Sequence, residues 1–81
     1  MIKKVTIKYF ALFRDRAGKD EEVWSTPSTT FSELFDEVSS EYQFNLEKKF
    51  IRVARNESYC GFEEVIEEGD VISFLPPLSG G

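Results

Sequence analysis

One segment of this chain has the periodicity of an amphipathic helix, and the segments on both sides of it alternate as strands do. Its apolar residues recur at intervals of three and four, which places them on one helix face: Phe31, Leu34, Phe35, Val38 and Tyr42. The polar residues between them are expected to face water: Ser32, Glu33, Asp36, Glu37, Ser40 and Glu41. A single long helix of this kind must bury its apolar face against another layer.

The start of this helix carries its own signal. Thr30 and Glu33 have the spacing of a capping box, in which each side chain accepts a hydrogen bond from a backbone N–H that the first turn leaves free. The sequence therefore predicts a helix that begins after Thr30.

Two strands are predicted before the helix. Residues 2–10 alternate in polarity, with three residues on the apolar face: Val5, Ile7 and Tyr9. Phe10 then falls on the polar face. Residues 14–20 hold charges and Gly18 and are interpreted as a broad loop, and residues 22–26 are predicted to form a second strand antiparallel to the first.

Further strands are predicted after the helix. Residues 51–55 alternate again, with Ile51 and Val53 directed inward, and residues 58–60 are interpreted as a short strand after a turn at Asn56.

The last strand is predicted over residues 71–75, after a turn at residues 68–70. It ends at Pro76 and Pro77, because proline cannot donate a hydrogen bond to a strand ladder. Its alternation divides the strand into an inward pair, Ile72 and Phe74, and an outward set, Val71, Ser73 and Leu75.

This order of elements defines a fold class. One amphipathic helix that crosses a mixed sheet is the β-grasp (ubiquitin-like) layout, an α+β fold with about five strands packed on one main helix. A chain of 81 residues has room for a single core. Residues 1–75 are therefore predicted to form one domain, and residues 76–81 an extended tail.

Composition disfavours several classes of function. The net charge of −5 argues against a nucleic-acid partner, because phosphate binding needs clustered Lys and Arg. No apolar run approaches the roughly 20 residues that span a bilayer, and the start of the chain lacks the apolar region of a signal peptide. We therefore expect no membrane partner and a cytoplasmic location. With no histidine and one cysteine, neither a metal site nor an intrachain disulfide is expected.

The candidate chemistry lies in the tail, which ends with Gly80 and Gly81. Pro76 and Pro77 hold its base extended, and six extended residues reach roughly 20 Å from the domain. The two glycines add no side chains, so a narrow active-site channel can admit this end. An α-carboxylate has a pKa of about 3.5 and is an anion at neutral pH, so it can attack the α-phosphorus of ATP when a partner supplies Mg²⁺.

The product of that attack, an acyl-adenylate, is open to a sulfur nucleophile. AMP leaves readily, and its replacement by sulfur gives a C-terminal thiocarboxylate. In this interpretation the chain is a substrate and sulfur donor, and a partner is the catalyst.

The tail motif resembles that of the small subunit of molybdopterin synthase, a family whose members end in a pattern close to Gly-Asp-x-Val-x-Phe-Phe-Pro-Pro-Val-Ser-Gly-Gly. Residues 69–81 follow this pattern, with Leu75 where an aromatic is common. Residues 9–14 resemble the family's aromatic-aromatic-Ala-x-x-Arg stretch. Residues 53–56 are similar in sequence to the family's Ala-Val-Asn, but here Arg55 stands before Asn56 as a departure from that pattern. The resemblance covers essentially the whole chain.

The resemblance implies a set of roles and partners. An adenylyltransferase similar to ubiquitin-activating enzymes would use ATP and Mg²⁺ to activate Gly81, which becomes 1-thioglycine. The tail, residues Pro76, Pro77, Leu78, Ser79 and Gly80, would then enter the large catalytic subunit in a heterotetramer and donate sulfur to a pterin precursor. The chain itself would be a non-catalytic, sulfur-donating subunit with no bound cofactor.

A docking surface is predicted at the base of the tail. If the first and last strands are neighbours, Phe10 and Leu75 form an exposed apolar patch, and exposed apolar clusters tend to mark interfaces. Alignment with the family adds Tyr59 to this partner interface.

Other readings stay open. The chain could carry sulfur for another pathway such as thiamine synthesis, although those carriers are usually shorter and lack Pro-Pro. It could be a protein modifier conjugated to lysine amines through Gly81, or an interaction domain with an inert tail. Cys60 is interpreted as a small hydrophobe and not a sulfur relay, and Trp24 as a packing residue. The acidic residues Glu63, Glu64, Glu67 and Glu68 are either a face for the activating enzyme or a solvated loop.

Overall fold

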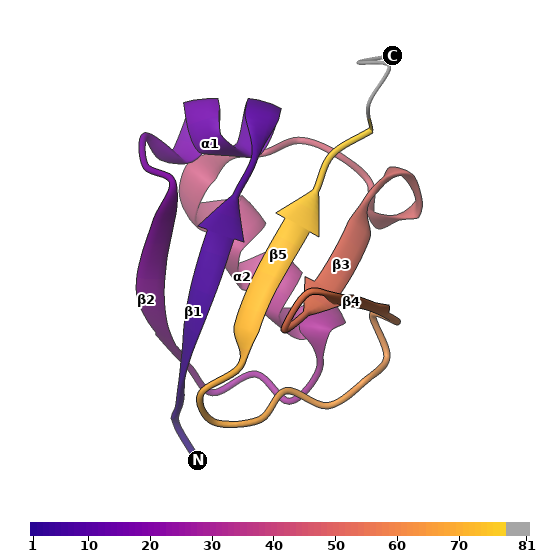
Figure 1. The fold of residues 1–81 in the computed structure, drawn as a ribbon. Coiled ribbons are helices and arrows are strands. Elements are labelled where there is room, and N and C mark those ends of the chain that lie inside the picture. The colour runs from indigo at the N-terminus through magenta and orange to yellow at the C-terminus, as the bar shows by residue number, and fades with distance from the viewer. Residues whose placement is uncertain (78–81) are drawn as a thin grey trace.

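A five-stranded mixed sheet with one long helix across one face forms the body of the protein, as Figure 1 shows. The computed structural model describes residues 1–77. Its elements in chain order are β1 (Lys3–Tyr9), α1 (Ala11–Ala17), β2 (Glu21–Thr26), α2 (Phe31–Tyr42), the short 3₁₀ turn η1 (Lys48–Phe50), β3 (Arg52–Arg55), β4 (Ser58–Cys60) and β5 (Val71–Leu75). The predicted β-grasp class, with five strands and one main helix, is confirmed.

The first and last strands lie side by side at the centre of the sheet, whose strand order is β2-β1-β5-β3-β4. β1 and β5 are parallel, with Tyr9 opposite Phe74, while β2 is antiparallel to β1 and β3 is antiparallel to both β5 and β4. Because neighbouring parallel strands run in the same direction, their carboxyl ends lie at the same end of the sheet. The residues that follow Tyr9 and Phe74 are therefore close to each other at this end. Figure 1 shows β1 and β5 ending at this same end of the sheet, and Pro76 and Pro77 follow β5 there.

The core lies between the sheet and α2. The strand residues predicted to point inward are buried: Val5, Ile7, Tyr9, Ile51, Val53, Ile72 and Phe74. They meet the predicted helix face, of which Phe31, Leu34, Phe35 and Val38 are buried and Tyr42 is half-buried. The Phe35 and Phe74 rings meet edge to face at 5.1 Å, which joins the middle of the helix to the central strand.

The predicted capping box is present at the start of α2. The Glu33 backbone N–H donates to Thr30 Oγ1 at 3.3 Å, and Glu33 Oε1 accepts from the Thr30 backbone N–H at 3.2 Å. These two bonds satisfy donors that the first turn leaves free, so the helix begins where the sequence predicts.

The predicted loop between the first two strands was wrong in part, because Ala11–Ala17 form the helix α1. The helix ends at Gly18, whose φ of +77° closes the last turn through a 2.9 Å bond from its N–H to the Arg14 carbonyl. Phe13 is fully buried and its ring lies 4.4 Å from that of Phe44. Burial of the Phe13 side chain stabilises this two-turn helix against the core. The helix is too short for its sequence to show a helical period.

The prediction that Glu37 faces water was also wrong. Its half-buried carboxylate accepts hydrogen bonds from the Trp24 indole N–H, from the Thr26 hydroxyl at 3.2 Å and from the Ser28 hydroxyl at 3.3 Å. Burial of an indole N–H and a carboxylate together is favourable only when each satisfies the other. Trp24 packs against the core, as predicted.

Part of the acidic segment is held to the domain by specific bonds. Arg55 donates to Asp70 at 3.1 Å and lies 3.7 Å from a Glu64 oxygen, and its guanidinium also donates to the Val65 carbonyl. Glu68 accepts from the Lys4 backbone N–H at 2.9 Å. Arg55, which interrupts the family pattern, therefore serves to fasten the loop before β5.

No helix within residues 1–77 is both long and apolar enough to cross a membrane.

Candidate functional site

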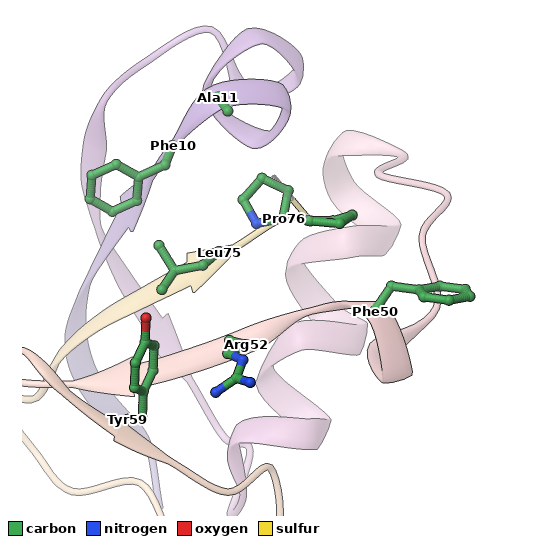
Figure 2. A pocket seen from close by; sticks show the side chains of 8 residues that line it. Phe10, Ala11, Phe50, Arg52, Tyr59, Leu75 and Pro76 are labelled. Carbon is green, nitrogen blue, oxygen red and sulfur yellow. The ribbon is translucent and has the colours of Figure 1, made fainter. Parts of the chain in front are cut away.

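A groove opens at the base of the tail, on the sheet face that α2 leaves uncovered. It has a volume of about 710 Å³ and is the feature we call the tail-base groove (Figure 2). Its lining residues are Phe10, Ala11, Phe50, Arg52, Tyr59, Leu75, Pro76 and Pro77.

The sheet brings the three predicted interface residues to this groove. Tyr9 and Phe74 point into the core, so the next residues along the chain, Phe10 in extended backbone just after β1 and Leu75 at the end of β5, point out. Phe10 is 42% exposed and Leu75 is half-buried. Tyr59 reaches the same face from β4, on the far side of β3, and is 68% exposed. Figure 2 shows these three side chains gathered at one side of the groove. Their role as an interface stays a prediction.

Two lining residues were missed by the sequence reasoning. Phe50 ends η1 and is 52% exposed, in a segment that has no periodicity to signal which way its side chain points. It lies apart from the other aromatic residues in Figure 2. Arg52 is the exposed residue of β3 and lies on its outward face, and an outward arginine on a strand carries no signal by itself.

Arg52 has two neighbours in the groove, Leu75 and Tyr59. Its Cα is opposite that of Leu75 in the antiparallel β3–β5 pair. Its guanidinium carbon lies 5.3 Å from the centroid of the Tyr59 ring, within range of a cation–π contact. The groove therefore combines an apolar lining with one positive charge.

The backbone turns sharply beside Phe10. Ala11 has a φ of +49°, in the left-handed region that few non-glycine residues occupy. The Phe10 carbonyl accepts the first bond of α1, from the Phe13 N–H at 3.0 Å. This turn leaves Phe10 outside, in the groove, and carries Phe13 into the core.

The tail begins at the groove. β5 ends at Leu75, and both Pro76 and Pro77 line the hollow. The remaining predicted tail residues, Leu78, Ser79 and Gly80, and the predicted catalytic Gly81, lie outside the described residues.

Other candidate groups lie beside the groove or away from it. Cys60 is half-buried, and burial, with the nearby Glu64 carboxylate, raises the pKa of its thiol. A raised pKa disfavours the thiolate that sulfur exchange needs. In the described part of the chain, no group of three His, Cys, Asp or Glu side chains could hold a metal ion.

The fold and the groove at the tail's base define a ubiquitin-like β-grasp protein. The ThiS family model matches residues 7–81, and the chain belongs to the ThiS family. The molybdopterin synthase sulfur carrier subunit of Anopheles gambiae is 31% identical over 84 residues, which cover 96% of this chain and 92% of that protein.

Two solved structures are similar over nearly their whole length. The putative molybdopterin converting factor subunit 1 of Pyrococcus furiosus is 30% identical with a TM-score of 0.80, and the match covers 94% of this chain and 99% of that chain. A chain from the crystal structure of the BexX/CysO complex of Amycolatopsis orientalis is 26% identical with a TM-score of 0.68, covering 95% and 99%.

Proposed function

We propose that this protein is the sulfur carrier subunit of a molybdopterin synthase, with Gly81 as the residue that carries the sulfur. The observation that carries the proposal is near-full-length similarity to a relative of that name, within a family whose match extends through Gly81. The groove gives further support, because β5 delivers Pro76 and Pro77 to it. A partner bound there would meet the residues that follow.

The proposed chemistry loads and unloads one sulfur atom. An oxygen of the Gly81 α-carboxylate attacks the α-phosphorus of ATP, and pyrophosphate leaves. Hydrosulfide then attacks the acyl carbon, and AMP leaves with that oxygen, so the product is a thiocarboxylate. The thiocarboxylate sulfur attacks a carbon of a sulfur-free pterin precursor and displaces an oxygen, which leaves as water. A second water then cleaves the acyl–sulfur bond of the thioester, so the sulfur stays on the pterin and the carboxylate is restored. Partner proteins supply the ATP site, Mg²⁺ and catalytic groups, while this chain supplies the acyl group and the docking surface.

Two protein partners follow from this cycle. An adenylyltransferase similar to ubiquitin-activating enzymes loads the carrier, and the large catalytic subunit receives the sulfur within a heterotetramer of two small and two large subunits. Both need a surface that presents the tail in a fixed direction. The tail-base groove has the exposed aromatic residues that interfaces favour.

Reconstitution of pterin sulfuration tests the proposal. The large subunit of molybdopterin synthase from the same organism is mixed with the sulfur-free pterin precursor and the chain in its thiocarboxylate form. We expect one dithiolene product for every two loaded chains, because each chain carries one sulfur atom. The unloaded chain, and a version that lacks Gly81, serve as controls and should give none.

Other outcomes would reassign the chain. Absence of product with a verified thiocarboxylate and an active large subunit would remove the molybdopterin assignment. Transfer of sulfur to a thiamine precursor would point to that pathway. Covalent conjugates on lysine amines would instead make the chain a protein modifier.

A further inference from the structure

We propose that Arg52 recognises a carboxylate of the partner that occupies the tail-base groove. The occupant is then a protein segment in which an Asp or Glu side chain stands beside an apolar side chain. The inference rests on the proposed function, because it names the chemistry of the surface that this carrier meets.

Among the described residues that line the groove, Arg52 is the one that carries a charge, in a protein of net charge −5. Within residues 1–77 it has no salt-bridge partner, whereas Arg14 pairs with Asp20 and Arg55 pairs with Asp70. Arg16 also lacks a salt bridge in this part of the chain, but it donates to the Gln43 carbonyl at 2.8 Å. Instead, the Arg52 guanidinium lies over the face of the Tyr59 ring, within range of a cation–π contact. Figure 2 shows the guanidinium close to Tyr59, with Leu75 between Tyr59 and Phe10.

Docking changes the solvation of the Arg52 guanidinium, which has no salt-bridge partner among residues 1–77. While the groove is open, water solvates the guanidinium. A partner that covers the apolar residues Phe10 and Leu75 also removes water from Arg52, and a buried unpaired charge is strongly unfavourable. An occupant that binds tightly must therefore bring a negative group to Arg52.

The lining indicates a carboxylate on a protein and not a phosphate. Tight phosphate sites gather several cations or backbone N–H groups, and this groove offers one cation amid aromatic and proline side chains. A guanidinium stacked on a ring keeps its edge donors free for a planar carboxylate. The apolar side chain of the segment would then fill the space between Phe10, Leu75 and Tyr59.

Binding of the large subunit to Arg52 variants tests the inference. The Kd is measured at low and high salt for the wild-type chain and for R52M, R52K and R52E. We expect R52M to weaken binding by about tenfold, R52E to weaken it further, and R52K to keep only part of the affinity, because lysine retains the charge but lacks the planar fork of donors that stacks on Tyr59. The salt dependence of the Kd should be smaller in R52M than in the wild type. K4Q is the matched control, since Lys4 is exposed on the same sheet face at the other end of β1, and it should bind as wild type.

Several results would overturn the inference. Wild-type affinity in R52M, or an equal loss in K4Q, would mean that Arg52 has no specific anionic partner. Self-association of the chain that R52M abolishes would assign the groove to a second copy. Thermal unfolding of each variant, expected to match wild type, excludes misfolding as the cause of a loss. If wild type itself does not bind the large subunit, the proposed function fails; if wild type binds and R52M binds equally, only this inference fails.

Discussion

Glu22 is the residue whose environment gives the clearest chemical prediction. Its Oε2 accepts hydrogen bonds of 2.6 Å from both the Tyr9 and Tyr42 hydroxyls, and its Oε1 lies 3.3 Å from the Lys19 ammonium. Desolvation on partial burial would raise the pKa of Glu22, but the bonds from Tyr42 and Tyr9 and the Lys19 charge outweigh it, so the pKa is lowered. Burial raises the pKa of Tyr9, which keeps that hydroxyl protonated as a donor.

The lowered pKa of Glu22 predicts a pH-dependent stability. A carboxyl whose folded pKa is below its ordinary value of 4.5 stabilises the fold above that value, and the contribution is lost as the pH falls through the folded pKa. E22Q should lower the free energy of unfolding by about 1 kcal/mol at neutral pH, because a neutral amide replaces an ionised acceptor. Urea unfolding from about pH 7 to about pH 3 measures this, and the difference from wild type should shrink below pH 4.5.

The matched control for that series is E21Q, because Glu21 is the exposed neighbour on the same strand. It should stay within about 0.5 kcal/mol of wild type. A deficit in E22Q that is the same at every pH would contradict the assigned role of the ionised carboxylate.

At the scale of elements, the start of α2 can be tested alone. T30A removes the side-chain oxygen that accepts from the Glu33 N–H, and it should cost about 1 kcal/mol of unfolding free energy. T29A is the control, since the adjacent Thr29 side chain is exposed and takes no part in the capping box. Equal stabilities of T30A and T29A in urea unfolding would show that the box contributes nothing.

The elements that the sequence predicted are those with enough residues to display a period. The alternation in β1 and β5 and the stripe of α2 each repeat several times, so burial of one face determines them. α1 could not be predicted in the same way, because one buried residue, Phe13, has no repeat. The side chain of Glu37 was misplaced for another reason: its donors come from β2 and the residue Ser28, which are brought beside the helix only by the tertiary fold.

At the scale of the whole molecule, the parallel pairing of β1 and β5 joins distant parts of the chain into one groove. Phe10 and Leu75 could be named from the alternation of the first and last strands, and Tyr59 from the family resemblance, together with their common location. Phe50 and Arg52 could not, because their place in the groove depends on how η1 enters β3. The sequence thus predicted three of the residues that line the candidate site and missed the Phe50 ring and the Arg52 charge.

If partners dock in the groove, a substitution of an exposed lining residue should weaken partner binding and leave the free energy of unfolding nearly unchanged. F10A removes an exposed ring, so the stability should change by less than about 1 kcal/mol, while the affinity for the large subunit should fall by tenfold or more, on the order of a hot-spot residue. V23A is the control, because Val23 is a 66% exposed apolar residue on β2 outside the groove. Calorimetric titration of both variants measures the difference, and unaltered binding by F10A would show that partners dock elsewhere.

The central claim is that Gly81 carries sulfur, and the most direct test is the intact mass of the protein. The chain is incubated with its adenylyltransferase, ATP, Mg²⁺ and hydrosulfide, beside a version that lacks Gly81. We predict a mass increase equal to the replacement of one oxygen by sulfur in the full chain and none in the shortened one. An unchanged mass, with an enzyme shown to be active, would contradict the claim.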